Sequence, residues 1–191
     1  MLENLKKYDV VLASNSPRRR ELLGELGVDY RIELIKGIDE SHPDTMPAHE
    51  VAEFLSRQKA YAYQLKTNEL LITADTVVIL DDDILGKPAD AAEAWSMLHR
   101  LSGRTHSVVT GVTVSTIDKV QSFSDEALVT FDELTDDEIN HYVEHYKPFD
   151  KAGAYGIQEW IGYIGVKSLQ GSFFTVMGLP VQRLYQLLKT L

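Results

Sequence analysis

Positively charged side chains gather in one short stretch that follows a predicted strand. Residues 10–13 (Val-Val-Leu-Ala) predict a buried strand, and Ser16 and Pro17 predict the cap and first position of a helix. Residues 18–20, all arginines, then fall in the first helical turn, where the backbone dipole favours anions. A bound phosphate removes this conflict, because free N–H groups, the Ser14 or Ser16 hydroxyl and guanidinium groups can hold it. The alternative is a solvated basic patch.

An aspartate and a lysine lie in predicted elements that disfavour charge. Asp75 lies near the middle of the strand-like run 70–80, although aspartate is depleted in strands and costly when buried alone. It is therefore a candidate to bind a metal or to activate water; the alternatives are a bulge or a salt bridge to a core lysine. Lys59 falls on the apolar stripe of a predicted helix over 47–66. It either directs its charge into a cleft or extends its ammonium to solvent.

Three more polar side chains could contact a phosphorylated ligand. Glu40 lies in a polar loop, and Lys87 is presented by a Gly-Lys-Pro turn. Gln158 can both donate and accept, as recognition of a base edge requires. It follows small residues at 152–156, which allow close approach of the backbone to a ligand or simply form a tight loop before a strand. Acids, cations and small polar groups together suit phosphoryl transfer, in which cations and Mg²⁺ neutralise a polyphosphate.

Other catalytic motifs are absent from the sequence or weak. It contains no G-x-x-x-x-G-K-[ST], no G-x-G-x-x-G and no G-x-S-x-G, which disfavours a P-loop enzyme, a dinucleotide-binding fold and the usual serine hydrolases. His141 and His145 match the zinc-protease spacing H-x-x-E-H. That short pattern arises easily by chance, and an inward Tyr142 and Val143 would leave the histidines near solvent. A zinc hydrolase that uses the two histidines is kept as an alternative.

Composition limits the class of protein. A chain of 191 residues with 44% hydrophobic side chains can bury a core as one domain or two closely packed lobes. It has no cysteine, which excludes disulfides and thiolate metal sites. The net charge of −10 argues against binding to nucleic-acid polymers, and an anionic substrate would need local cations and a divalent metal. With no signal peptide or apolar span, we expect a cytoplasmic protein that does not bind membranes.

Strand and helix patterns alternate along the chain and predict an α/β (mixed α+β) fold around a mixed sheet. The expected strands are 30–35, 70–80, 107–116 and 120–131, with a hairpin formed by 163–169 and 172–177. The expected helices begin at Ser16, Pro47, Asp90 and Thr135, and a last helix follows Pro180. Residues 81–83, three aspartates, predict a hairpin turn.

The stretch at 12–23, L-A-S-x-S-P-R-R-x-E-L-L, resembles the signature of the Maf family of nucleoside triphosphate pyrophosphatases. Five later segments resemble the same family in the right order: Ala74-Asp75-Thr76, Leu85-Gly86-Lys87-Pro88, residues 101–106, residues 150–158 and residues 176–180. Each segment alone is weak, but six in order are specific and span most of the chain. The resemblance implies one Maf-like domain over 1–191, with two lobes on a long mixed sheet, flanking helices and an active-site cleft between the lobes. It also implies a homodimer.

The resemblance further implies hydrolysis of a nucleoside triphosphate between its α and β phosphates. The pattern is that of the branch acting on dTTP and UTP, with modified pyrimidine nucleotides as further candidates. Asp75 resembles the family's general base, close to the metal (Mg²⁺ or Mn²⁺), and Glu40 its metal-associated acid. The positions that resemble phosphate-binding residues are Ser14, Arg18, Arg19, Lys59 and Lys87, and those tied to base choice are Arg19, Thr76 and Gln158.

The chain departs from the family pattern at two places. Lys147 precedes Pro148 where the family usually has Glu, which bears on metal affinity and electrostatics. Residues 159–161 (Glu-Trp-Ile) follow Gln158 where the family is usually smaller and Gly-rich, which bears on the base pocket. A nucleotide-binding regulator of cell division without turnover is a second alternative. Asp75 argues against it, because pure binding of a triphosphate gains nothing from a base beside the phosphates.

Overall fold

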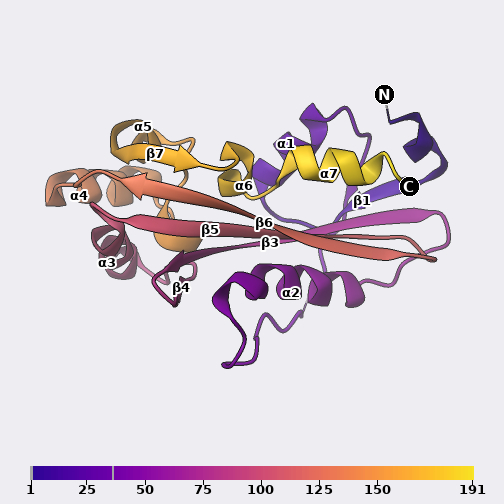
Figure 1. Ribbon diagram of the computed structural model, residues 1–191, viewed down its shortest axis with the longest axis horizontal. Coiled ribbons are helices and arrows are strands. Elements are labelled where there is room, and N and C mark those ends of the chain that lie inside the picture. The colour runs from indigo at the N-terminus through magenta and orange to yellow at the C-terminus, as the bar shows by residue number, and fades with distance from the viewer. Residues whose placement is uncertain (1, 36) are drawn as a thin grey trace. The chain divides into compact units, whose positions relative to one another are not determined.

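A computed structural model describes residues 2–35 and 37–191 and contains a seven-stranded mixed sheet (Figure 1). The strands are β1 (Asp9–Leu12), β2 (Arg31–Ile32), β3 (Glu69–Leu80), β4 (Asp83–Leu85), β5 (Thr105–Ser115), β6 (Val120–Phe131) and β7 (Val166–Gln170). Their order is β2-β1-β3-β5-β6-β7, with β4 paired to β3. The β1 strand is parallel to both β2 and β3, whereas β4 is antiparallel to β3 and β7 to β6. The mixed α/β prediction is confirmed.

Helices connect and cover these strands. They are α1 (Pro17–Glu25), α2 (Ala48–Tyr61), α3 (Ala91–Leu101), α4 (Asp136–Tyr146), α5 (Trp160–Gly165), α6 (Phe173–Met177) and α7 (Val181–Leu188), with 3₁₀ turns η1 (Glu3–Lys7) and η2 (Ala152–Ala154). The predicted caps are confirmed, since Ser16, Asp90 and Thr135 each accept a hydrogen bond from the third backbone N–H of their helix. None of the described helices is both long enough and apolar enough to cross a membrane.

The chain divides into two compact units. The first comprises Met1–Asp75, Thr110–Asp125 and Gly178–Leu191, and the second comprises Thr76–Val109 and Glu126–Met177. Strands β3, β5 and β6 each contribute residues to both units. The prediction of a single domain over 1–191 stays a prediction, as does the position of the active site relative to the two lobes.

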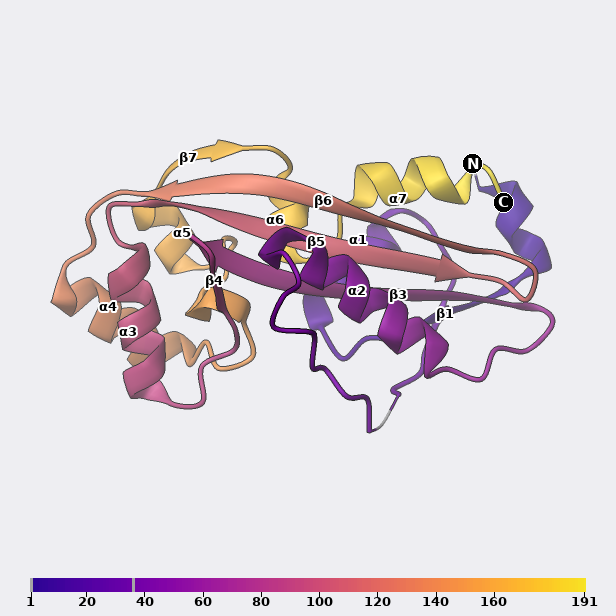
Figure 2. The ribbon, with the colours of Figure 1, turned by 60° about the horizontal axis from the view of Figure 1, so that its bottom comes forward.

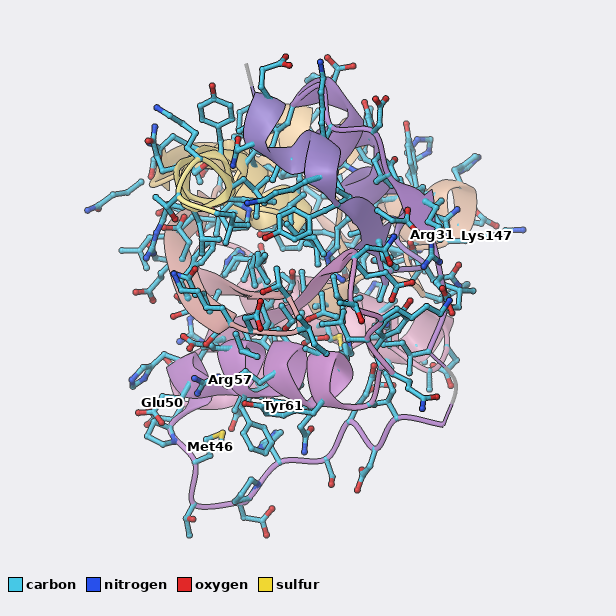
Figure 3. The ribbon with its side chains drawn as sticks, turned by 90° about the vertical axis from the view of Figure 1, so that its right-hand side faces the viewer. Arg31, Met46, Glu50, Arg57, Tyr61 and Lys147 are labelled. Atoms are coloured by element: carbon cyan, nitrogen blue, oxygen red, sulfur yellow. The ribbon has the colours of Figure 1, made fainter. Side chains whose placement is uncertain are left out.

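In the first unit, α2 lies on one side of the strands and α1 and α7 lie on the other (Figures 1 and 2). Glu50, Arg57 and Tyr61 point away from the strands along the outer side of α2 (Figure 3). The opposite side of the helix, which includes the buried Val51 and Ala52, packs on the sheet. The polar and apolar faces of α2 therefore lie as its sequence pattern predicts.

The contact between α2 and the sheet is unusually close at one glycine. A Cβ on Gly111 of β5 would lie 2.3 Å from the backbone carbon of Ala52 and 2.3 Å from the backbone nitrogen of Glu53. No side chain fits at that position, so the helix backbone rests directly on the strand. Glycine is required there for packing, not for a turn.

The second unit has its own core beneath α3, α4 and α5, built from Val78, Leu98, Phe131, Ile139 and other apolar residues. His106 is buried in it, and its Nε2 lies 2.7 Å from the hydroxyl of Tyr155. Burial lowers the pKa of His106 to about 4 and raises that of Tyr155. The imidazole is therefore neutral at neutral pH and shares a hydrogen bond with the protonated hydroxyl of Tyr155.

Three predicted elements differ from the structure. The strand expected over 30–35 pairs only at Arg31 and Ile32, because β1, its parallel partner, ends at Leu12. The helix expected over 47–66 ends at Tyr61, because the next turn places the Tyr63 hydroxyl within 3.0 Å of Glu33. Tertiary contacts therefore override the local pattern at both places.

The hairpin expected over 163–177 is wrong. Residues 160–165 form α5 and residues 173–177 form α6, so only β7 between them is extended. A Cβ on Gly162 would lie 1.8 Å from the carbonyl oxygen of Ile157, which shows how tightly α5 turns against the preceding segment. The β7 strand pairs instead with β6, with Val129 opposite Leu169. A β-branched, aromatic-rich sequence is helical here because packing outweighs propensity.

Candidate active site

The loop after β1 leads directly into the N-terminus of α1, as the sequence predicts. Ser14 is buried, and its hydroxyl oxygen accepts a hydrogen bond from the backbone N–H of Ser16 at 3.2 Å. The hydroxyl of Ser16 in turn accepts from the backbone N–H of Arg19 at 3.4 Å. Pro17 occupies the first helical position. These contacts fix the serines at a helix end that favours anions.

The three arginines of α1 differ in what they contact. Arg20 stabilises the loop itself, because its Nη2 lies 3.4 Å from the Ser14 carbonyl oxygen and 3.2 Å from Asn15 Oδ1. Arg19 donates from Nε to the carbonyl oxygen of Gly178 at 2.8 Å, which joins the first motif to the last one. Arg18 and Arg19 are half-buried. The contacts of Arg20 therefore serve the conformation of the loop.

Lys59 joins the two predicted acids. Its ammonium is ion-paired with Asp75 and lies 2.9 Å from Glu40 Oε1. The side chains of Lys59 and Asp75 are 13% and 16% exposed, whereas that of Glu40 is 56% exposed. This arrangement is compatible with both interpretations of Asp75 drawn from the sequence. A core lysine balances its charge, and the carboxylate lies in a cluster of the type that phosphoryl transfer needs.

The surrounding charges also act on Arg19. Burial lowers the pKa of the Arg19 guanidinium, Asp75 and Glu40 oppose that shift, and Arg18 adds to it. The first unit therefore brings together Arg18, Arg19 and the two acids within electrostatic reach of one another. Ser14, another predicted site residue of this unit, lies just before the start of α1, the helix that carries both arginines.

Two carboxylates suit a hard divalent cation. Mg²⁺ and Mn²⁺ prefer oxygen ligands, and Mg²⁺ commonly takes one or two carboxylates and completes its coordination with water and substrate phosphates. Glu40 and Asp75 provide such a pair, both within contact of one ammonium group. Among the described residues, no group of three or more His, Asp or Glu side chains could hold a metal. The donor set therefore fits a metal whose remaining ligands come from water or substrate.

Hydroxyl groups fix Lys59 opposite Asp75, a feature that sequence analysis missed. Thr73 donates from Oγ1 to the carbonyl oxygen of Ser56 at 2.6 Å, and the Ser56 hydroxyl lies 2.7 Å from that of Thr113. Thr73 and Asp75 are two residues apart on β3, and Ser56 and Lys59 three apart on α2, so each pair shares a face. The signal in the sequence is a hydroxyl residue on the same face as each charged residue. Thr73 lies two residues before Asp75, and Ser56 lies three residues before Lys59.

In the second unit, the turn that carries Lys87 is tied to the segment that leads to Gln158. The backbone N–H of Gly153 donates to the carbonyl oxygen of Gly86 at 3.0 Å. Gly153 has φ +66, and a Cβ there would lie 2.9 Å from Val78. Lys87 itself is exposed, and Thr76 on β3 is half-buried. The small residues thus allow close packing of a tight loop, although the next element is α5 and not a strand. Close approach of this backbone to a ligand stays a prediction.

The side chain of Gln158 has an unusual surrounding. Its carboxamide oxygen is buried and accepts no hydrogen bond from the described residues. The next residue, Glu159, accepts a hydrogen bond from Tyr142 and lies 3.1 Å from the buried Lys151. Burial and Glu159 together raise the pKa of Tyr142, which keeps its hydroxyl protonated. Sequence analysis missed this cluster, although residues 159–161 departed from the family pattern.

The two histidines of α4 do not form a metal centre with any other described residue. Their rings stack with centroids 4.3 Å apart, and His145 Nδ1 lies 2.8 Å from the carbonyl oxygen of His141. The ring of Trp160 packs edge-on against His141. Both histidines are exposed, as the inward position of Tyr142 predicts.

Comparisons with known proteins agree with the arrangement of motifs. The family model described as "Maf-like protein" matches residues 9–191. A protein of Parabacteroides distasonis named dTTP/UTP pyrophosphatase is 57% identical over 191 residues, covering 99% of each chain. One of Phocaeicola vulgatus with the same name is 54% identical over the full length of both. A HAM1 protein structure from Coxiella burnetii has a TM-score of 0.39 at 17% identity, over 63% of this chain and 70% of that one.

Proposed function

Because this chain belongs to the family of Maf-like proteins, we propose that it hydrolyses dTTP and UTP to the nucleoside monophosphate and pyrophosphate. Relatives with that name are 57% and 54% identical over essentially their whole length. The observation that carries the proposal is the cluster in which Lys59 joins Asp75 and Glu40 beside the arginines of α1. Modified pyrimidine nucleotides are further candidate substrates.

We assign the proton transfer to Asp75. Its carboxylate accepts a proton from the water that attacks the α-phosphorus, and pyrophosphate is the leaving group. Lys59 holds that carboxylate in place and offers its charge to the phosphate oxygens. Ser14, Arg18 and Arg19 bind the triphosphate together with the N-terminal N–H groups of α1.

Glu40 and Asp75 would hold a divalent cation, Mg²⁺ or Mn²⁺. When bound, such an ion neutralises phosphate charge and polarises the phosphoryl group. The ammonium of Lys59 already balances both carboxylates, so the two acids are held near each other without it. We therefore assign the cation to these two carboxylates.

We assign three residues of the second unit to substrate binding. Lys87 contacts phosphate, and Thr76 and Gln158 contribute to base choice together with Arg19. The buried, unpartnered carboxamide oxygen of Gln158 supports this role, because a buried acceptor is destabilising until a donor reaches it. The expected homodimer stays a prediction.

The decisive test is a panel of dTTP, UTP, CTP, ATP and GTP with Mg²⁺, with products followed by phosphorus NMR. We expect pyrophosphate from dTTP and UTP. Asp75→Asn should lower kcat by about 1,000-fold or more, since general bases contribute about 100- to 10,000-fold and this one also orders the cluster. The variant should keep its fold, as circular dichroism would verify.

Other outcomes would redirect the proposal. Pyrophosphate mainly from another nucleotide would keep the chemistry and change the specificity. Orthophosphate would mean cleavage at a different bond. Tight nucleotide binding without turnover would favour the regulator, and activity lost on substituting His141 or His145 would favour the zinc hydrolase. A near wild-type rate in Asp75→Asn would overturn the assigned base.

A further inference from the structure

Glu159 joins two buried side chains from other parts of the second unit. Its Oε2 accepts a hydrogen bond from the hydroxyl of Tyr142 on α4, and its Oε1 lies 3.1 Å from Nζ of Lys151. Tyr142 is fully buried and Lys151 nearly so. In a poorly solvated place, such a carboxylate fixes its partners more firmly than a surface ion pair does.

Gly156 closes this cluster through its backbone. Its N–H donates to the Tyr142 hydroxyl at 3.0 Å, and its carbonyl oxygen accepts from the backbone N–H of Glu159 at 2.9 Å. A Cβ on Gly156 would lie 2.9 Å from Cδ of Glu159 and 3.1 Å from Cε of Lys151. Glu159, Lys151 and Tyr142, here called the Glu159 clamp, therefore lie directly against the Gly156 backbone.

Gln158 lies between the two residues that the clamp holds. Gly156 is fixed through Tyr142, and Glu159 is fixed by its own side chain. Ile157, between them, is buried, and Gly162 packs so closely on its carbonyl that no Cβ fits there. The backbone of Gln158 is thus restrained on both sides, while its carboxamide oxygen is buried with no partner among the described residues.

A carboxamide carried on a restrained backbone can distinguish two pyrimidines. Uracil and thymine present an N3–H donor next to carbonyl acceptors, which match the acceptor and donor of a glutamine amide. Cytosine presents a ring-nitrogen acceptor next to an amino donor, so it requires the amide in the opposite orientation. A site built to hydrogen-bond one base rejects another strongly because its buried polar groups are then left unpaired, and a restrained backbone limits how far the carboxamide can move to avoid this.

We propose that Glu159 is a positioning residue that sets the preference for uridine and thymidine triphosphates over cytidine triphosphate. The proposal rests on the proposed function, because it assigns Gln158 to base recognition. Glu159 acts through the backbone of Gly156 and Gln158 and does not touch the reacting phosphates. It should therefore affect KM and base choice much more than kcat.

The test compares Glu159→Ala, Glu159→Gln and Tyr142→Phe with Glu144→Gln, an exposed glutamate on α4 that serves as the matched control. Kinetics with UTP and CTP give KM and kcat for each. We expect Glu159→Ala to raise KM for UTP about 10-fold with kcat changed by less than about 3-fold, and to lower the UTP-to-CTP preference about 10-fold. Glu159→Gln should retain part of the preference.

Tyr142→Phe provides a second test of the proposal in case the Glu159 variants do not fold. It removes one hydroxyl, leaves the Lys151–Glu159 ion pair and frees the N–H of Gly156. It should lower the UTP-to-CTP preference in the same direction as Glu159→Ala. An unchanged preference in a folded Tyr142→Phe protein, or equal changes in Glu144→Gln, would overturn the proposal.

Hydrogen exchange without nucleotide separates this inference from the proposed function. Amides of residues 156–159 should exchange about 10-fold faster in Tyr142→Phe than in the parent protein if the clamp restrains them. Unchanged exchange would overturn the clamp even where the enzyme is active. If the parent protein hydrolyses neither UTP nor dTTP, the proposed function fails and the assignment to base choice fails with it, whatever the exchange rates show.

Discussion

Each unit holds a lysine between two carboxylates, and the surroundings of the two lysines differ. Lys59 of the first unit is paired with Asp75 and Glu40, and the nearby Arg18 and Arg19 add positive charge to the same place. Glu40 is more than half exposed, so one partner can reach solvent and ligands. This cluster carries more charge than folding alone requires.

Lys151 of the second unit is paired with Asp150 and Glu159, at 2.7 Å and 3.1 Å. The hydroxyl of Tyr142 joins this cluster through Glu159, and the backbone N–H of Gly156 donates to that hydroxyl. These contacts hold the loop that carries Gln158. The comparison indicates that similar ion pairs serve binding where further charges converge and positioning where neutral donors complete them.

The largest expected difference between the two lysines is in activity. Lys59→Gln should lower kcat/KM by about 1,000-fold, because phosphoryl transfer depends on cations placed at the phosphates. Its melting temperature should also fall, because the side chain of Asp75 is only 16% exposed and loses its ion pair. Lys151→Gln should lower the melting temperature as well, since Glu159 is 21% exposed and loses its ion pair, but it should change kcat/KM by less than about 10-fold.

Steady-state kinetics and thermal unfolding of both variants, in parallel, provide the measurement. If Lys151→Gln were inactive and Lys59→Gln kept the activity of the parent protein, the comparison would be wrong.

A second prediction concerns the packing of α2, the helix that carries Lys59, and leaves the charge of Lys59 unchanged. Gly111→Ala should destabilise the protein by about 3 kcal/mol, because the new methyl group would overlap the α2 backbone near Ala52. The helix carries Lys59, so activity should fall with it. Gly24→Ala in α1 is the control: a Cβ there meets no atom within 4 Å, and it should stabilise by about 0.5–1 kcal/mol.

Urea unfolding of the two glycine variants measures both effects. Equal stability of Gly111→Ala and the parent protein would show that α2 can shift away from β5 at little free-energy cost.

A third effect, of similar size, is expected from acid in the second unit. His106 is buried and neutral, with a folded-state pKa of about 4 against 6.5 for the unfolded chain. The unfolded chain therefore binds one more proton between these values, so the stability that His106 contributes is complete above pH 6.5 and is lost as the pH falls toward 4. The loss approaches about 3 kcal/mol.

Urea unfolding between pH 7 and pH 4 measures this loss, and His106→Gln should flatten the curve while keeping an acceptor for the Tyr155 hydroxyl. A His106→Gln curve as steep as that of the parent would assign the pH dependence to carboxylates, including those paired with the two lysines.

Local signals predicted some features well. Ser16 and Pro17 predicted the start of α1, because capping depends only on adjacent residues, and the apolar stripe that included Lys59 predicted its inward position. The end of α2 could not be predicted, because Tyr63 is drawn toward Glu33, thirty residues earlier. The strands expected over 163–169 and 172–177 are partly helical, in α5 and α6, for a similar reason.

For the candidate site, too, single residues could be selected from the sequence but their contacts could not. Individual residues such as Asp75 could be selected, because a carboxylate inside a strand pattern is unusual in itself. Their pairing could not be derived, since Lys59 and Glu40 reach Asp75 from two other segments. The Glu159 clamp was missed because it consists of ordinary residues whose significance lies in two contacts between α4 and the following loop and one ion pair within that loop.

The hydroxyl contacts of Thr73, Ser56 and Thr113 have a consequence for how α2 can move. Apolar packing is nondirectional, so a helix held by it alone could slide by one turn, about 5.4 Å, and still bury a similar surface. Such a slide would carry Lys59 past Asp75. The hydrogen bond from Thr73 to the Ser56 carbonyl forbids it, because it is satisfied at a single register. These hydroxyl groups therefore fix the position of α2 along its own axis, and replacing them with methyl groups of equal volume would allow the helix to slide.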